Sequence, residues 1–215
     1  MIKNALVLLG DYYHPENYLK EGLGRVFKKE KENIETIYIN DPFNMNWDKI
    51  INYDLIINSK AGWVSHEERQ TSWLSKEKQN KLYTFVKNGG GYIVLHSGLT
   101  SYPTEGKYQK LVKGYFDYHP DDHQLIKVKV KETHPVVKGI NDFEIEDEQY
   151  FLKVNTSETN VLLEGVSKKG KAIVGWAHKL NKGKTCCLTP GHKSEVLKHP
   201  EMKKLLSNAI QWCLN

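Results

Sequence analysis

The sequence predicts an α/β fold of three layers, in which helices cover both faces of a mostly parallel sheet with an antiparallel extension. Short apolar runs at residues 5–9, 54–58 and 92–95 are typical of strands that are buried on both faces. Segments with helical spacing of apolar residues lie between these runs, which indicates a doubly wound arrangement. Beyond residue 125, apolar and charged residues alternate, as in antiparallel strands with one face in water.

The first half of the chain alternates strands and helices. Its expected elements are strands at 5–9, 35–39, 54–58 and 92–95, and helices at 17–31 and 76–87. Ser75 is a suitable N-cap for the second helix, and the run of glycines at 89–91 is a strong stop signal after it. The fourth strand ends at His96.

The second half favours short strands and one long helix. Strands are expected at 125–130, 143–146, 161–163, 172–176 and 185–188, and a helix from about Pro200 to Leu214. No linker or repeat separates the halves, so the sequence predicts a single domain over residues 1–215.

Composition excludes several classes of function. The net charge is +5, but the lysines alternate with acids, as at residues 28–32, and no nucleic-acid-binding motif accompanies them. No apolar stretch is long enough to span a membrane, and no signal-peptide pattern is present. Cys186, Cys187 and Cys213 lack metal-ligand spacing and are expected to be reduced thiols. We therefore expect a cytoplasmic protein that binds neither nucleic acid nor membranes; a homo-oligomer is left open.

The candidate site follows from the predicted topology. Ligands of open parallel sheets bind beyond the carboxyl ends of the strands. The loops there are 10–15, 59–63 and 96–98, and two of them carry a histidine. His96 is the strongest candidate, because a polar side chain at the end of a buried strand needs a partner. Imidazole suits both proton transfer and metal binding.

Three familiar mechanisms lack their motifs. Ser97 is flanked by Leu95 and Leu99, so the G-x-S-x-G turn of serine hydrolases is absent. Position 96 holds no cysteine nucleophile, and the glycines at 89–91 precede a strand, unlike those of a phosphate loop.

An ordered set of motifs over nearly the whole chain resembles the ThuA-like, or trehalose-utilisation, family. The motifs are GGGYIVLHSG at 89–98, LVKGYF at 111–116, His119-Pro120, HPVVKG at 134–139, DEQY at 147–150, Trp176, His178, GK at 183–184, TPGH at 189–192 and NAIQW at 208–212. The resemblance implies a flavodoxin-like fold related to class I glutamine amidotransferases. In those enzymes a cysteine holds the position of His96, so glutamine hydrolysis is not expected. The family is associated with disaccharide and keto-sugar metabolism. The stretch at 101–106 departs from many relatives, which are richer there in aromatic or acidic residues.

The leading hypothesis is therefore an enzyme acting on a small carbohydrate such as trehalose or a keto-sugar. The expected catalytic residues are His96, Glu148 and His192, and the expected substrate-binding residues are His14, Trp63, Tyr102, His119, Gln124 and His178. If the protein uses a cofactor, a divalent metal such as zinc on His96, His119 and His192 is the expected one. The alternative is a non-catalytic sugar-binding or regulatory module, and a third hypothesis is a hydrolase that uses Ser97.

Overall fold

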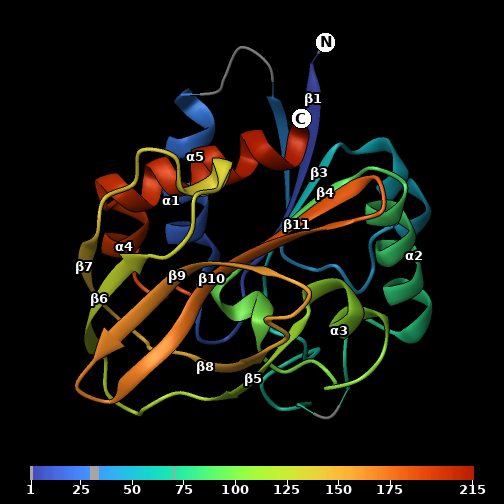
Figure 1. The fold of residues 1–215 in the computed structure, drawn as a ribbon. Helices are drawn as coiled ribbons and strands as arrows, with labels where there is room; N and C mark the ends of the chain where they lie inside the picture. Colours follow the sequence, from blue (N-terminus) through green and yellow to red (C-terminus); the bar gives the residue numbers. More distant parts are fainter. Residues whose placement is uncertain (1, 30–33, 70) are drawn as a thin grey trace.

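The computed structural model describes residues 2–29, 34–69 and 71–215 and has an α/β fold built on a large mixed sheet (Figure 1). In chain order its elements are β1 (Lys3–Leu9), α1 (Glu16–Lys29), β2 (Ile34–Ile39), η1 (Trp47–Asn52), β3 (Leu55–Ser59), α2 (Lys76–Lys87), β4 (Gly91–Leu95), η2 (His96–Leu99), α3 (Lys107–Val112), β5 (Gly114–Tyr118), β6 (Gln124–Val130), η3 (Pro135–Val137), β7 (Phe143–Asp147), β8 (Phe151–Val154), β9 (Asn160–Ser167), β10 (Gly170–Leu180), β11 (Gly183–Leu188), α4 (Ser194–Lys198) and α5 (Pro200–Leu214). The η segments are short 3-10 helices.

The main sheet has the strand order β2-β1-β3-β4-β11-β10-β9-β6-β7. Neighbouring strands are parallel from β2 to β11 and antiparallel from β11 to β7. We expected a mostly parallel sheet with a smaller antiparallel extension. The antiparallel part is instead as extensive as the parallel part. The expected strand at 185–188 is β11, which pairs in parallel with β4 and joins the two parts.

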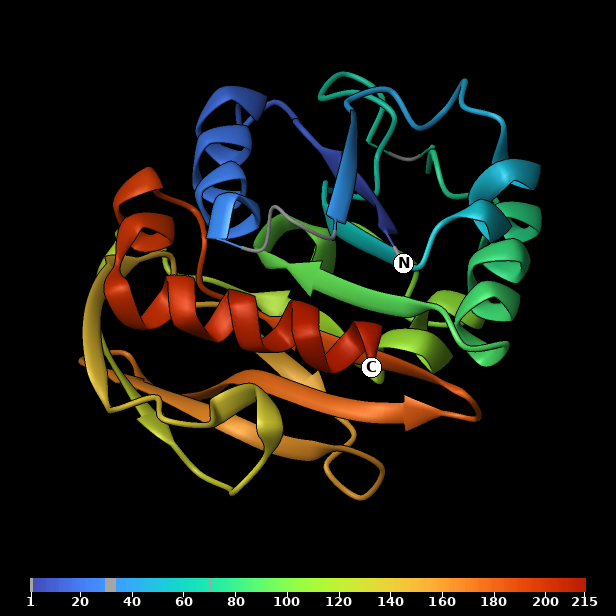
Figure 2. The same cartoon turned by 90° about the horizontal axis from the view of Figure 1, so that it is seen from above.

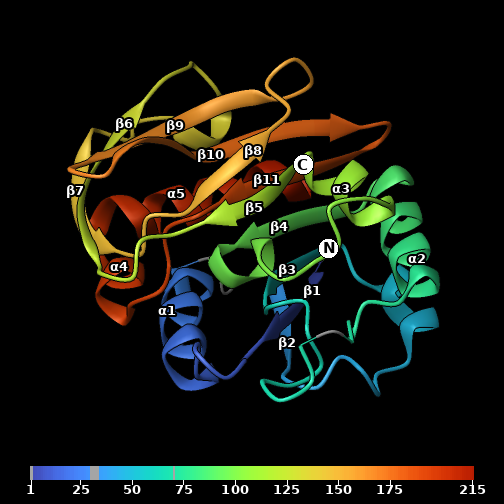
Figure 3. The ribbon, with the colours of Figure 1, turned by 90° about the horizontal axis from the view of Figure 1, so that it is seen from below.

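Helices cover both faces of the sheet. In Figure 3, α1, α4 and α5 lie on one side and α2 and α3 on the other. Alternate residues of β1 divide accordingly between two cores: Ala5, Val7 and Leu9 pack with the first group of helices, and Leu6 and Leu8 with the second. The helix α5 packs along the middle of the sheet against β4 and β11 (Figure 2). Burial on both sides explains why the central strands are almost wholly apolar.

The predicted local signals agree with several elements. Ser75 caps α2 by accepting a hydrogen bond from the backbone of Lys78, and Pro200 begins α5. Cys186 and Cys187 point to opposite cores, and all three cysteines are buried and unbridged. None of the helices in the described part of the chain is long and apolar enough to cross a membrane.

A separate two-stranded sheet, β5 with β8, was not expected from the sequence. It lies at the lower edge of Figure 1, on the side where the parallel strands end. It contacts η2 and α3 and so forms one wall above the end of β4.

Candidate functional site

His96 lies at a strained turn between β4 and η2. Its φ is 45°, a left-handed conformation that costs a non-glycine residue about 1–3 kcal/mol. Two glycines make the turn possible. A Cβ on Gly98 would lie 2.2 Å from the carbonyl oxygen of Asn58, and one on Gly191 would lie 3.3 Å from Cβ of His96. The backbone at His96 is therefore strained, and its imidazole is fully buried at the end of the strand.

The tautomer of His96 is fixed by its neighbours. Its Nδ1 lies 2.7 Å from the carbonyl oxygen of Thr189, which can only accept, so Nδ1 carries the proton. The lone pair on Nε2 is left to accept a hydrogen bond of 3.0 Å from the hydroxyl of Tyr150. Burial lowers the pKa of His96 to about 4, so the ring is neutral at pH 7.

His14 is oriented in the same way from the loop after β1. Its Nδ1 lies 2.6 Å from Oδ1 of Asp11 and donates its proton there. The other oxygen of Asp11 accepts a hydrogen bond from the backbone of Ala61. Burial would raise the pKa of Asp11, but the hydrogen bond and charge of His14 outweigh it and lower that pKa. Nε2 of His14 therefore presents a lone pair, 3.1 Å from Nδ1 of His192.

His192 lies in the loop after β11, which is held by a buried carboxylate. Oδ2 of Asp147 accepts a hydrogen bond of 2.7 Å from the backbone of Gly191, and Oδ1 accepts one of 3.1 Å from the backbone of His192. Burial raises the pKa of Asp147 to about 7. The Asp147 side chain thereby fixes the backbone of the loop that carries His192.

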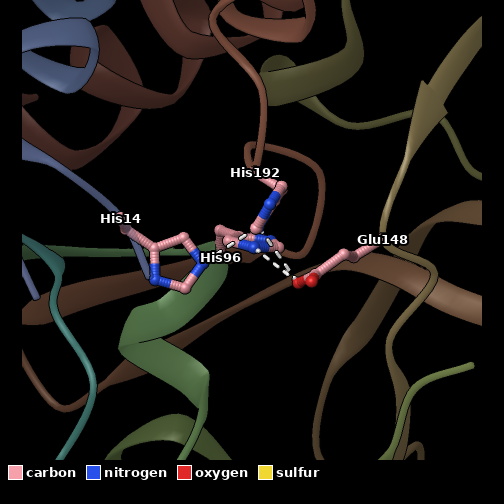
Figure 4. Close-up of side chains that lie close together, drawn as sticks. All are labelled: His14, His96, Glu148 and His192. Carbon is pink, nitrogen blue, oxygen red and sulfur yellow. Dashed lines mark hydrogen bonds and ion pairs between the residues drawn. The ribbon is translucent and has the colours of Figure 1, made fainter. Parts of the chain in front are cut away.

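Glu148 closes the cluster from the end of β7. Its Oε2 lies 3.3 Å from Nε2 of His96 and 3.2 Å from Nδ1 of His192. Burial would raise the pKa of Glu148, but the hydrogen bond from His192 and the contact with His96 hold that pKa far below its usual range. Burial would also lower the pKa of His192, but Glu148 outweighs it and raises that pKa. Figure 4 shows the four side chains converging from four different loops.

The cluster has the composition and size of a metal centre. One ligand atom from each of His14, His96, Glu148 and His192 lies within 4.8 Å of all the others. Three imidazoles and a carboxylate form a donor set that zinc and related divalent cations accept. Asp11 and Thr189 orient two of the imidazoles as the outer partners of metal-binding histidines do.

A pocket of about 360 Å³ opens above the cluster. Its aromatic lining is formed by Tyr13, Trp63, Phe116 and Tyr150, and its polar lining includes His14, Arg69, His119 and Glu148. This volume lies within the range of small-molecule sites. A larger hollow of about 690 Å³ lies at the opposite edge of the sheet, and no histidine lines it among the described residues.

The structure brings together only part of the residue set expected from the sequence. His14, His96, Glu148 and His192 form the cluster, and Trp63 and His119 line the pocket. His119 does not belong to the cluster of possible ligands found among the described residues; its Nδ1 lies 2.7 Å from the carbonyl oxygen of Pro120. The group that could hold a metal therefore differs from the expected set of His96, His119 and His192, because it contains His14 and Glu148 and lacks His119.

Three expected substrate-binding residues lie elsewhere. Tyr102 is buried, stacks on Tyr108 with ring centroids 4.0 Å apart, and donates a hydrogen bond to the carbonyl oxygen of Lys60, so it has no free ring face for a sugar. Gln124 is buried and donates to the carbonyl oxygen of Asp122. His178 is buried with Nε2 3.0 Å from the carbonyl oxygen of Leu111. None of the three lines the pocket above the cluster, and His178 lines a separate pocket with His134 and Trp212.

Sequence reasoning missed Asp11, Asp147 and Tyr150 as parts of the site. Asp11 stands three residues before His14, and Asp147 and Tyr150 flank Glu148 by one and two residues. Proximity to a predicted ligand was the available signal. It does not show which neighbour points inward, because that depends on the local backbone. Ser97, the residue of the hydrolase hypothesis, is fully buried.

Comparisons with known proteins agree with this fold. A family model described as trehalose utilisation (ThuA) matches residues 4–213. A comparison with curated proteins finds no match. Among solved structures, a ThuA-like protein of Bacteroides uniformis is similar with a TM-score of 0.74 at 20% identity, covering 98% of this chain and 91% of that one. A ThuA-like protein of Parabacteroides merdae gives a TM-score of 0.78 at 14% identity, covering 100% and 91%.

A more distant likeness is to part of a larger enzyme. A β-galactosidase of Bacillus circulans sp. alkalophilus gives a TM-score of 0.61 at 13% identity; the match covers 98% of this chain but 31% of the other. At such identity the likeness shows the fold alone.

Proposed function

Since the chain belongs to the ThuA family, which is linked to trehalose utilisation, we propose that it is a carbohydrate-processing enzyme that works at the cluster of His14, His96, Glu148 and His192. The observation that carries the proposal is the convergence of these four side chains beneath an aromatic pocket. The substrate class is a small sugar or keto-sugar.

The protonation pattern supports a divalent cation at the cluster. Nδ1–H of His14 is donated to Asp11 and Nδ1–H of His96 to Thr189, so both Nε2 lone pairs face the cluster. Nε2 of His96, which accepts a hydrogen bond from Tyr150, also lies 3.3 Å from a carboxylate oxygen of Glu148, and a positive charge at the cluster would stabilise two acceptors at that distance. A bound zinc or similar cation would supply that charge, and it would polarise a substrate oxygen or lower the pKa of a bound water.

The remaining chemistry falls to groups that line the pocket. His119 donates Nδ1–H to the carbonyl oxygen of Pro120, which leaves Nε2 as a base that can accept a proton from the substrate. The rings of Trp63, Tyr13 and Phe116 offer apolar faces against which a sugar ring can stack. His96, neutral at pH 7, suits the role of ligand better than that of general acid.

The turn at His96 also supports the relation to class I glutamine amidotransferases. A positive φ immediately after a central parallel strand, followed two residues later by Gly98, is the backbone pattern of a nucleophile elbow. With histidine there, and with Cys186, Cys187 and Cys213 buried, glutamine hydrolysis has no nucleophile. We also propose a cytoplasmic location, since a structural neighbour from Salmonella typhimurium is named a cytoplasmic protein.

The test is turnover of trehalose and a panel of keto-disaccharides by protein prepared without a histidine tag. His96→Asn and His192→Asn should each lower turnover by about 100-fold or more. His134→Asn is the matched control, because His134 caps η3 through its side chain and asparagine can do the same. Binding of these sugars without turnover would favour the sugar-binding module instead.

A further inference from the structure

We propose that the carbohydrate recognised in this pocket carries an anionic group, a carboxylate or a phosphate, which binds to Arg69. The inference rests on the proposed function, since it takes the pocket above the cluster as the sugar site. Beyond that function, it specifies that the substrate is negatively charged and that Arg69 binds the charged group.

Arginine is rare in this chain. The chain contains two arginines and 29 lysines, so nearly all of its positively charged side chains are lysines. Arg25 forms an exposed ion pair with Glu21 on α1. Arg69 is the other, and it lines the pocket above the cluster. A planar guanidinium binds a carboxylate or phosphate through two parallel hydrogen bonds, which a lysine cannot reproduce.

The guanidinium is held in place by the aromatic wall of the pocket. It lies over the ring of Trp63, 5.0 Å from the centroid, and 5.9 Å from that of Tyr13. Its Nη2 donates a hydrogen bond of 3.0 Å to the hydroxyl of Tyr13, and Nε donates one of 3.0 Å to the carbonyl oxygen of His66. Nη2 also contacts the ring of His66 at 2.6 Å. Arg69 is exposed, and these contacts restrain its guanidinium at the pocket wall, which lowers the entropy cost of binding an anion.

Its charge is left for a ligand. Among the residues that the structure describes, no carboxylate lies within ion-pair distance of Arg69, and Nη1 makes no hydrogen bond. The pKa of the exposed Glu67 is lowered by hydrogen bonds from its own backbone and Ser65, and also by the charge of Arg69, but Glu67 and Arg69 form no ion pair. Glu148 also lines the pocket, but its carboxylate is engaged by His96 and His192. A ligand anion at Arg69 would place its sugar against Trp63, with the cluster beyond.

The experiment compares the binding of D-glucuronate, glucose 6-phosphate and glucose by calorimetry. Wild-type protein should bind at least one of the anionic sugars about 10-fold or more tightly than glucose, and the preference should weaken at high salt. The two anionic sugars separate a carboxylate from a phosphate. Arg69→Gln should lower the affinity for that anionic sugar much more than the affinity for glucose, and Arg69→Lys should retain part of the preference. Arg25→Gln is the matched control and should behave like the wild type.

Two results overturn the inference while the proposed function stands. One is equal affinity for glucose and both anionic sugars in the wild type. The other is an equal loss for all three sugars in Arg69→Gln, which would give Arg69 a purely structural role in its loop. If none of the three sugars binds the wild type and no sugar in the turnover panel reacts, the pocket is not a carbohydrate site and both proposals fail together.

Discussion

Asp11 lies 2.6 Å from Nδ1 of His14 and, through its other oxygen, accepts a hydrogen bond from the backbone of Ala61. One carboxylate therefore ties the loop after β1 to the loop after β3 and turns the Nε2 lone pair of His14 toward the other cluster residues. Asp11→Asn should lower the affinity for zinc about 10–100-fold, because the amide fixes the imidazole less well. Competition with a chromogenic chelator measures it. Asp48→Asn, at an exposed carboxylate in η1, should leave the affinity unchanged.

The close approach of η2 to β3 depends on Gly98. A Cβ there would lie 2.2 Å from the carbonyl oxygen of Asn58, so Gly98→Ala should lower the free energy of unfolding by about 1–3 kcal/mol or prevent folding. The control is Gly24→Ala in α1, where the nearest atom to a Cβ is 3.9 Å away. It should raise the free energy of unfolding by about 0.5–1 kcal/mol. Urea unfolding monitored by circular dichroism gives both values. A Gly98→Ala variant with the same free energy of unfolding as the wild type would contradict the close packing of η2 on β3.

His178 should make stability depend on pH. Burial lowers its pKa from 6.5 to about 4, so the unfolded chain binds a proton between these values and the folded protein does not. Stability should therefore fall as the pH drops from 6.5 toward 4, by up to about 1.4 kcal/mol per pH unit from this residue. His178→Gln keeps a donor for the carbonyl oxygen of Leu111 and should show a shallower loss over that window. Identical slopes of melting temperature against pH would show that His178 does not titrate as described.

Two aromatic residues that the sequence did not distinguish should behave differently. Trp63 lines the pocket, so Trp63→Ala should raise the KM of a turned-over sugar about 10-fold or more through the loss of a stacking surface. Tyr102→Phe removes a buried hydrogen bond to Lys60 and should lower the free energy of unfolding by about 1 kcal/mol while leaving KM unchanged. A raised KM in Tyr102→Phe would return that residue to the site.

The fold was largely accessible from local patterns. The apolar run of β4, the Ser75 cap of α2 and the apolar stripe of α5 are signals contained in short segments, and the structure has these elements where they were expected. The extent of the antiparallel part was not accessible, because pairing such as β6 with β9 joins distant segments. The short elements α3, β5 and β8 carry too few residues for a recognisable period.

The site was accessible in part for a similar reason. The rule that ligands bind where parallel strands end leads to His14 and His96, which follow β1 and β4, whereas His192, which follows β11, came from the family resemblance. It cannot say which way a loop side chain points. His119 and Gln124 were expected at the site from the family resemblance, whereas His119 lines the pocket without joining the cluster and Gln124 donates to the backbone. The supporting role of Asp11 depends on a contact with the distant loop after β3, which sequence spacing does not reveal.

The cluster of His14, His96, Glu148 and His192 should bind a cation that the chemistry needs. The most direct test is elemental analysis of protein prepared without a histidine tag, combined with turnover before and after treatment with a chelator. We predict close to one divalent cation per chain, lost together with activity on chelation and in His96→Asn, and restored to the wild type by added zinc or a related cation. A metal-free preparation that keeps full turnover would contradict the claim.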